Sequence, residues 1–490
     1  MNERTLALHG ARVSVPTYER RALRPGVVHI GVGAFHRSHQ AAYFDDLARR
    51  GLGDGWAITG VGLHRPELKQ ALDPQDGLYT VVTRGADGDS ARVVGVITRY
   101  VYAPQARGAV LHALSDARTR VVTLTITANG YKVDVESGGF DENDPAVVHD
   151  LAHPGDPRSA LGFLVEALEL RRRSGIPPFT VLSCDNLTDN GAVARTAIVS
   201  MATLRDPRLA DWVAEHGAFP DSMVDRITPC TTDEDRAMVE RAFGVRDRWP
   251  VMTEPFSQWV IEDSFCDGRP PLDEVGVQFV QDVRPYALTK TRLLNASHSA
   301  LGYLGFLAGH SRLDATMADP PFAAYVEALM DEEITPLLPA VGIDLPTYTA
   351  SLRNRFANAR VADPLTRLCR NGSTKVPSHL LSSIREARAL GRPHALLTLA
   401  VAAWCRYLRV VGDGASAVEL DDPRGKVLQA LARAGGTDPR PLLAHEPTFG
   451  SLGACPDYVE EVRRDVWELE YDDPRAVIER RTMVGSGVAS

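Results

Sequence analysis

Through the first 285 positions, short runs of β-branched residues alternate with helical stretches, and this alternation stops near Pro285. Alternation of this kind is typical of an open parallel sheet covered by helices. It predicts strands at residues 27–30, 56–61, 121–127 and 179–183, with a helix at residues 39–50. Beyond Pro285 the pattern predicts helices almost exclusively, at residues 288–309, 322–330, 377–390, 394–410 and 458–469.

The bulk composition excludes several classes of protein. The chain has 490 residues, too many for one hydrophobic core, so two domains are expected. A net charge of −9 without a basic tail argues against nucleic-acid binding. No signal peptide is visible, and the apolar stretch 296–309 is shorter than the ~20 residues of a membrane span. Six scattered cysteines show neither zinc-site spacing nor a disulfide framework, so a metal-free protein of the cytoplasm is expected.

One glycine turn has the context of a dinucleotide-binding turn. Gly31, Val32 and Gly33 follow a predicted strand and precede a predicted helix, where the main chain can approach a pyrophosphate. His36 stands where the usual third glycine would be, and the GxG pattern recurs elsewhere in the chain. The pattern alone therefore leaves nucleotide binding and an ordinary turn equally open.

The loop after the second predicted strand bears on the choice of coenzyme. Glu67 is the only acid there, and an acid at this place binds the ribose hydroxyls of NAD. Arg65 would instead favour the 2′-phosphate of NADP. Two solvated charges without a ligand are the third interpretation. The loop thus predicts NAD and leaves NADP open.

A second polar cluster begins the helical half of the chain. Lys290, Asn295 and His298 lie in the segment YALTKTRLLNASHS, and on one α-helix they fall within roughly a 140° arc. Such groups are costly to bury on an apolar helix unless they are paired or functional. Two interpretations remain open: a catalytic set, or a helix start with a solvated Lys290 and a hydrogen-bonded His298.

Several long motifs together resemble the mannitol dehydrogenase family, which comprises long-chain polyol dehydrogenases and fructuronate-type reductases. In chain order they are VVHIGVGAFHRSHQAAYFDDL, TITANGY, SCDNLTDNG, MVDRITP, QWVIED and KTRLLNASHSALGYLG. The resemblance covers nearly the whole chain. It implies an α/β fold with a Rossmann-type parallel-sheet NAD-binding domain, assigned to residues 1–285. A mainly α-helical substrate domain over residues 286–490 follows, with the active site in the cleft between the two.

The resemblance also implies roles for individual residues. Lys290 corresponds to the general base, and Asn186 and Asn295 to amides that stabilise the oxyanion. His298 corresponds to a residue that orients the substrate. The groups expected to bind substrate are Asp225, Arg367 and Lys375. The residues expected to bind NAD are Ile30, Gly31, Val32, Gly33, Ala34, Phe35, His36, Arg37 and Glu67.

The chemistry of alcohol oxidation agrees with these roles. Without zinc to acidify the hydroxyl, a side chain must take its proton. A lysine does so only when neutral, which requires its pKa to fall from ~10.4 toward ~7–8. The resemblance implies acids at two positions that here are Ala128 and Ala287, so the route of the proton to solvent stays open.

The expected activity is a metal-independent, NAD-dependent interconversion of a sugar alcohol and a ketose, with mannitol and fructose as the first choice. A fructuronate-type reductase is an alternative, because Arg367 or Lys375 could bind a carboxylate; Asp225 would repel one, which favours a neutral polyol. Arabinitol dehydrogenase is a further alternative. The intact Lys290 set argues against a non-catalytic nucleotide-binding module. The expected partner is a small polyol or ketose, and the oligomeric state is open, a monomer included.

Overall fold

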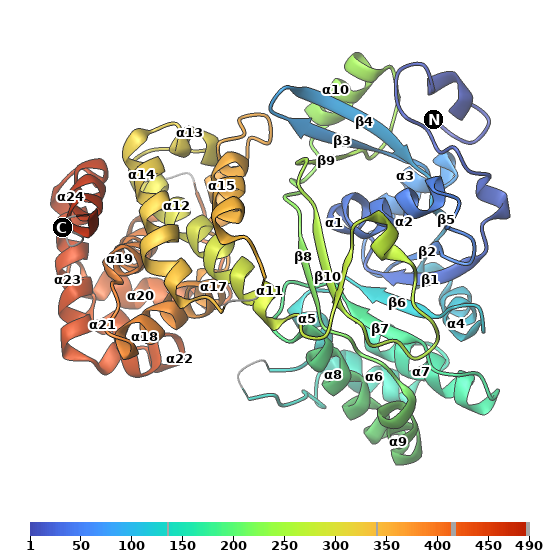
Figure 1. The fold of residues 1–490 in the computed structure, drawn as a ribbon. Helices are drawn as coiled ribbons and strands as arrows, with labels where there is room; N and C mark the ends of the chain where they lie inside the picture. The colour runs from blue at the N-terminus through green and yellow to red at the C-terminus, as the bar shows by residue number, and fades with distance from the viewer. Residues whose placement is uncertain (135–136, 340–341, 413–417, 487–490) are drawn as a thin grey trace. The chain divides into compact units, whose positions relative to one another are not determined.

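The chain folds into two compact units, Met1–Arg284 and Pro285–Ser490, each with its own hydrophobic core. Figure 1 draws the computed structural model, which describes residues 1–134, 137–339, 342–412 and 418–486. Within these ranges no helix combines the length and apolarity needed to cross a membrane.

A five-stranded parallel sheet forms the centre of the first unit. Its spatial order is β5-β2-β1-β6-β7. The strands are β1 (Pro25–Ile30), β2 (Ala57–Gly62), β5 (Ile97–Tyr102), β6 (Val121–Leu124) and β7 (Thr180–Ser183). The order reverses between β1 and β6, which is the place where ligands bind in sheets of this type. The predicted α/β fold class is confirmed.

Alternating side chains of these strands enter two different cores. Val28, Val122 and Val181 pack with helices on one face, namely α4 (Arg107–Ser115), α7 (Ala160–Arg173), α8 (Asn190–Arg205) and α9 (Pro207–His216). Val27 and Ile58 point to the opposite face, against α2 (Gln40–Arg49) and α3 (Pro66–Leu72). The two-residue period of a strand explains this division. Figure 1 shows the helices on both faces of the sheet.

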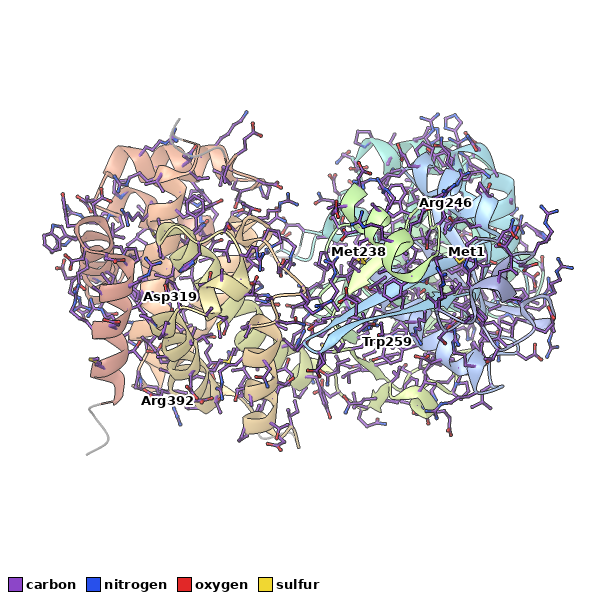
Figure 2. The ribbon with its side chains drawn as sticks, turned by 90° about the horizontal axis from the view of Figure 1, so that it is seen from above. Met1, Met238, Arg246, Trp259, Asp319 and Arg392 are labelled. Carbon is purple, nitrogen blue, oxygen red and sulfur yellow. The ribbon has the colours of Figure 1, made fainter. Side chains whose placement is uncertain are left out.

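Two small sheets complete the first unit. One is ordered β4-β3-β9, from Gly88–Val94, Tyr79–Gly85 and Val251–Thr253; the other is ordered β11-β10-β8, from Gln278–Val280, Gln258–Glu262 and Ser222–Asp225. Trp259 of β10, labelled in Figure 2, is fully buried and packs its ring against Tyr43 and Phe44 of α2. The second sheet is thereby joined to α2, the second helix after the glycine turn. The remaining helices are α1 (Ala34–Ser38), α5 (Ala128–Tyr131), α6 (Pro145–Ala152) and α10 (Asp233–Phe243).

The strand predicted at residues 121–127 is too long, because β6 ends at Leu124. The next residues leave the sheet, and the main-chain amides of Ile126 and Thr127 donate to the side chain of Asp185 instead of to a neighbouring strand. Thr127 has φ +63°, a value that no strand contains. A side chain distant in the sequence therefore ends this strand.

The described residues of the second unit form helices joined by loops, with no β-strand. Its α-helices are α11 (Arg284–Thr289), α12 (Ala296–Leu307), α13 (Leu313–Met317), α14 (Pro320–Ala328), α15 (Leu345–Phe356), α16 (Leu365–Leu368), α17 (Gly372–Val376), α18 (Ser382–Ala389), α19 (Ala395–Val410), α20 (Gly425–Gly435), α21 (Arg440–Leu443), α22 (Glu446–Phe449), α23 (Pro456–Tyr471) and α24 (Pro474–Ser486). Asp319, labelled in Figure 2, joins three of them, because it accepts hydrogen bonds from His310 after α12 and Arg475 in α24.

Three segments of this unit are π-helices: η6 (Lys290–Asn295), η7 (Leu329–Ile334) and η9 (Pro377–Leu381). The single helix predicted over residues 288–309 is therefore wrong in its first part, where η6 separates α11 from α12. Short π-helical segments are frequent at functional sites. This one begins at Lys290 and ends at Asn295, two of the residues predicted to be catalytic.

Candidate functional site

The turn after β1 requires glycine at its first position. Gly31 has φ +101°, and a Cβ atom there would lie 2.1 Å from the carbonyl oxygen of Thr125. Its amide donates to the carbonyl of Val61 at 2.9 Å, which holds the turn against the end of β2. Only glycine combines the positive φ with the small volume that this place allows. The fold itself thus explains Gly31.

Gly33 has a different explanation. A Cβ atom at Gly33 would meet no protein atom closer than the Gly31 carbonyl oxygen, 3.7 Å away. The protein's own packing therefore leaves room for a side chain here, although the residue is glycine. Open space beside a glycine at the start of α1 suits the close approach of a pyrophosphate to the main chain. The residues present fit a dinucleotide. Among the other predicted contacts, Ile30 and Val32 are buried, whereas Ala34 and Phe35 are half-buried.

His36, at the place of the third glycine, packs into the sheet. Its ring stacks on His29 of β1, with centroids 3.4 Å apart, and both of its ring nitrogens are buried without a hydrogen-bond partner. Burial lowers the pKa of His36 well below its usual value and that of His29 to about 3, so both rings are neutral. The neutral His36 ring therefore lies between α1 and the sheet. A glycine at this position would let the helix pack closer to the strand.

Arg37 uses its guanidinium to hold the turn. The guanidinium donates hydrogen bonds to the carbonyls of Gly33 and Trp249 and lies over the ring of Tyr79. The main-chain carbonyl of Arg37 accepts a hydrogen bond from the Tyr79 hydroxyl. The side chain is almost fully buried. Its charge therefore faces main-chain oxygens of the first unit.

Glu67 and Arg65 lie beyond the end of β2, at the start of α3. Arg65 is the N-cap of α3, and Glu67 is the acid in its first turn. Both side chains are exposed. An acid shortly after the second strand is where one is expected to meet the ribose hydroxyls of NAD, while Arg65 is near enough in the chain to keep NADP an open choice.

Two further predicted residues lie at or just beyond the ends of strands in the first unit. Asn186 follows β7 by three residues and is exposed, whereas Asp225 is the last residue of β8 and is buried. Arg226 ties the Asp225 end to α1, because its guanidinium donates to the Ser38 carbonyl at 2.5 Å. The first unit therefore holds the Asp225 segment against the end of α1, the short helix that follows the glycine turn.

In the second unit, the π-helix η6 changes how Lys290 and Asn295 are related. In a π-helix the main-chain hydrogen bonds join residues five apart, so these two residues lie nearly above one another. The predicted α-helical spacing placed them at the far edges of their arc. Both are buried, with exposed fractions of 8% and 9%. His298 follows in α12 with its ring 4.6 Å from that of Phe356.

Cationic side chains surround His298. Burial, and next the charges of Arg367 and Arg355, lower the pKa of His298 far below its usual value. Burial also lowers the pKa of Lys375 to about 8, again with Arg367 as the largest neighbouring charge. The Arg367 guanidinium forms two hydrogen bonds to the Asp363 carboxylate. The second unit thus places Arg367 and Lys375 close to the neutral imidazole of His298.

His379 is a site neighbour that the sequence analysis missed. It lies on η9, four residues after Lys375, with Nδ1 3.2 Å from the Ser299 hydroxyl and its ring bonded to the Asn295 main-chain carbonyl. Burial, and next the charges of Lys375 and Lys290, lower its pKa to about 3. The neutral ring connects η9 to the end of η6. A histidine one turn after a predicted substrate lysine was the available signal.

The described side chains include no group of three or more His, Cys, Asp or Glu arranged to hold a metal ion. All six cysteines are free thiols. In the first unit the predicted residues gather at the ends of β1, β2, β7 and β8. In the second unit, Lys290, Asn295, His298, Arg367 and Lys375 gather around η6 and η9.

Comparison with known proteins covers both units. The sequence profile of the mannitol dehydrogenase Rossmann domain matches residues 25–274, and that of the mannitol dehydrogenase C-terminal domain matches residues 282–470. A mannitol 2-dehydrogenase of Aspergillus fumigatus is 45% identical over 463 residues, which are 92% of this chain and 92% of that protein.

Two solved structures share the fold. Pseudomonas fluorescens mannitol 2-dehydrogenase, in a ternary complex with NAD and D-mannitol, is 41% identical, with a TM-score of 0.89 over 98% of this chain and 99% of that one. A D-sorbitol dehydrogenase in substrate-free form is 34% identical, with a TM-score of 0.88 over the same shares of the two chains.

Proposed function

The chain belongs to the mannitol dehydrogenase family, and we propose that it interconverts a neutral sugar alcohol and the corresponding ketose with NAD, mannitol and fructose being the leading pair. The observation that carries this proposal is the likeness, over nearly the whole chain, to an enzyme solved with NAD and D-mannitol. The predicted family resemblance is confirmed, as is polyol dehydrogenase activity at the level of the family.

The glycine turn and Glu67 are the residues proposed to hold the coenzyme. The open space beside Gly33 suits the pyrophosphate, and the exposed Glu67 carboxylate suits the ribose hydroxyls. Bound NAD would supply the acceptor for the hydride that leaves the carbinol carbon. The side chains of the protein then have to remove the hydroxyl proton and stabilise the charge left on oxygen.

Lys290 is the proposed base. A lysine accepts a proton only as the neutral amine, and burial favours that form. The amide groups of Asn295 and Asn186 are proposed to donate to the oxygen as it becomes alkoxide-like. Amides suit this role because they donate hydrogen bonds to a negative charge without transferring a proton to it. No metal takes part in this proposal.

The other predicted residues are proposed to bind the substrate hydroxyls. His298 is neutral, so one ring nitrogen can donate while the other accepts. Its Nε2 is buried and has no partner in the protein, which leaves it for a substrate hydroxyl. Asp225 can accept hydrogen bonds, and Lys375 can donate them. Such a mixed set suits a polyol, in which every hydroxyl both donates and accepts.

The alternative substrate is a sugar acid, as in the fructuronate-type reductases. An arginine free to form a bidentate pair would be the expected partner of its carboxylate. Arg367 already forms that kind of pair with Asp363. Its bidentate edge is therefore engaged, and this observation favours a neutral substrate. Arabinitol remains a close second to mannitol among neutral polyols.

The test compares neutral and acidic substrates with one enzyme preparation. We expect kcat/KM to be at least about tenfold higher for mannitol, arabinitol or sorbitol than for mannonate, and for fructose than for fructuronate, a difference of ~1.4 kcal/mol. Treatment with EDTA should leave these rates unchanged. A tenfold preference for the acids would overturn the substrate assignment, and activity lost to EDTA but restored by zinc would overturn the metal-free mechanism.

A further inference from the structure

Thr127 has a main-chain conformation that threonine rarely adopts. Its φ is +63° and its ψ is 164°. A β-branched side chain is strongly disfavoured there, and glycine is the residue that suits this region. Thr127 lies in the segment of residues 125–131, which follows β6, includes the short helix α5 and is given the name β6 loop. A strained residue at the carboxyl end of a central strand indicates that surrounding groups impose its conformation.

The carboxylate of Asp185 is the group that holds the strained residue. It accepts the amide of Thr127 on Oδ1 at 2.9 Å, and on Oδ2 it accepts the amide of Ile126 at 3.0 Å and the Tyr131 hydroxyl at 2.8 Å. The side chain is buried, and this burial raises its pKa while the two amides and the hydroxyl lower it. Three donors converge on one carboxylate and leave the β6 loop little freedom.

Asp185 is itself fixed at the end of β7. Its carbonyl accepts the side-chain amide of Asn190 at 3.0 Å, and that amide also donates to the Ser222 carbonyl at 2.9 Å. The Tyr131 hydroxyl lies 2.7 Å from the Ser183 hydroxyl, on the last residue of β7. The loop is therefore fastened to a rigid strand end. The next residue in the chain is Asn186, the proposed oxyanion amide.

The other end of the β6 loop is fastened to the glycine turn. The amide of Thr125 donates to the Ile30 carbonyl at 3.0 Å, and its hydroxyl donates to the Gly31 carbonyl at 2.8 Å. The same hydroxyl lies 3.0 Å from Nε2 of His29. One loop of seven residues thus contacts the turn proposed to bind the coenzyme and the residue next to Asn186.

We propose that Asp185 is a positioning residue, which holds the β6 loop in its strained form and so fixes Asn186 relative to the glycine turn. This inference rests on the proposed function, since it assigns Asn186 and the turn to the same reaction. Asp185 touches neither coenzyme nor substrate in this role. It acts through the three hydrogen bonds that it accepts.

Asp185→Asn tests the proposal, because an amide NH2 would face one of the main-chain N–H donors. We expect kcat to fall roughly 10- to 100-fold, the loss typical of a displaced catalytic group, with a much smaller change in the dissociation constant of NADH. Hydrogen exchange over residues 124–131, followed by mass spectrometry, should accelerate. Turnover is expressed per site titrated with NADH, so that loss of folded protein is not counted as loss of rate.

Thr127→Gly supplies the decisive second variant. Glycine adopts the native φ without help, so Thr127→Gly alone should remain near the wild-type rate, and combined with Asp185→Asn it should recover most of the lost kcat. Tyr131→Phe, which removes one of the three hydrogen bonds, should cost only a few-fold. A purely stabilising role predicts a lower melting temperature with unchanged kcat and no rescue by glycine.

Either of two results would overturn the positioning role of Asp185: full kcat in Asp185→Asn, or no recovery of kcat in the double variant. Should Asp185→Asn not fold, rapid exchange of the Ile126 and Thr127 amides in the wild-type protein would overturn it as well. These exchange and NADH-binding measurements do not involve Lys290 or the identity of the substrate. Failure of the positioning role of Asp185 is therefore distinguishable from failure of the proposed function.

Discussion

The two units differ in the exposure of the polar side chains proposed to meet the ligand. In the first unit, Asn186 and Glu67 are exposed, whereas His36, Arg37 and Asp225 are buried. In the second unit, Lys290 and Asn295 are buried within a π-helix. Exposed groups keep their ordinary solvation until a ligand arrives, so their contribution depends on position. A buried titratable group has its ionisation changed by its surroundings, as burial lowers the pKa of His298 far below its usual value.

This contrast also separates what holds each half in place. In the first unit, side chains hold loops in place by accepting hydrogen bonds from main-chain amides, as Asp185 does for the β6 loop. The second unit fixes helices against each other, as His379 does between η9 and η6. Changes in the first unit are therefore expected to alter recognition and geometry, and changes in the second to alter proton chemistry or stability.

The largest effect is expected from the buried base. Lys290→Ala should lower kcat by at least roughly 100-fold, the contribution of a general base. Binding of NADH, measured by fluorescence titration, should stay near the wild-type value because the coenzyme residues lie in the first unit. Small amines added to the assay should restore part of the rate. Lys426→Ala, at an exposed lysine of α20, is the matched control and should retain full activity.

Wild-type turnover in Lys290→Ala would disprove the mechanism. A simultaneous loss of NADH binding would instead show that the variant damages more than the base, and the contrast between the two units would then not hold.

The sequence predicted the parts of this protein that depend on local pattern. The alternation of strands and helices gave the parallel sheet, and the motifs gave the family. The individual site roles remain predictions. The sequence did not indicate that β6 stops at Leu124, because the side chain that takes over the amides of Ile126 and Thr127 is about sixty residues away in the chain.

The π-helix was missed for a related reason. Its hydrophobic pattern is close to that of an α-helix, and the choice between hydrogen bonds to the fourth or the fifth residue is made by tertiary packing. The hydrogen bond between the His379 ring and the Asn295 main-chain carbonyl is part of that packing. Seven strands were also not predicted: β3, β4, β5, β8, β9, β10 and β11. Of these, β8, β9 and β11 have three or four residues each, too few for a two-residue alternation to be recognised.

The exposed coenzyme acid should give an intermediate effect. Wild-type enzyme is expected to prefer NAD, and Glu67→Lys should move the ratio of kcat/KM for NAD over NADP toward NADP by roughly tenfold or more, since a lysine attracts the 2′-phosphate that the carboxylate repels. Because Glu67 is exposed, the melting temperature should hardly change. Arg65→Ala is the control for the neighbouring charge and should leave the NAD rate intact. If the wild-type enzyme prefers NADP, Arg65 rather than Glu67 decides the choice.

The smallest effect concerns a buried acid of the second unit outside the site. Glu333 of η7 accepts the amides of Leu396 and Leu397, at 2.8 and 2.9 Å, at the start of α19. Burial raises its pKa from 4.5 to about 7, against the opposing effect of the two amides. Between these pH values the folded protein binds more protons at this group than the unfolded chain does. Its contribution to stability is therefore fully present below pH 4.5 and is lost as the pH rises through 7.

The shift of the Glu333 pKa corresponds to about 3 kcal/mol at most, and so to a fall of at most roughly 10 °C in the melting temperature as the pH rises from 5 to 8. Glu333→Gln removes the titrating group, so its melting temperature should fall much less over the same range. Asp344→Asn is the matched control. Asp344 caps α15 at the surface, where a hydrogen bond from Thr347 lowers its pKa from 3.8. The contribution of Asp344 is thus constant above pH 5, and its variant should keep the wild-type pH dependence. If the melting temperature of Glu333→Gln depends on pH as that of the wild-type protein does, burial does not govern the ionisation of Glu333. The contrast between the two units would then be limited to the site residues.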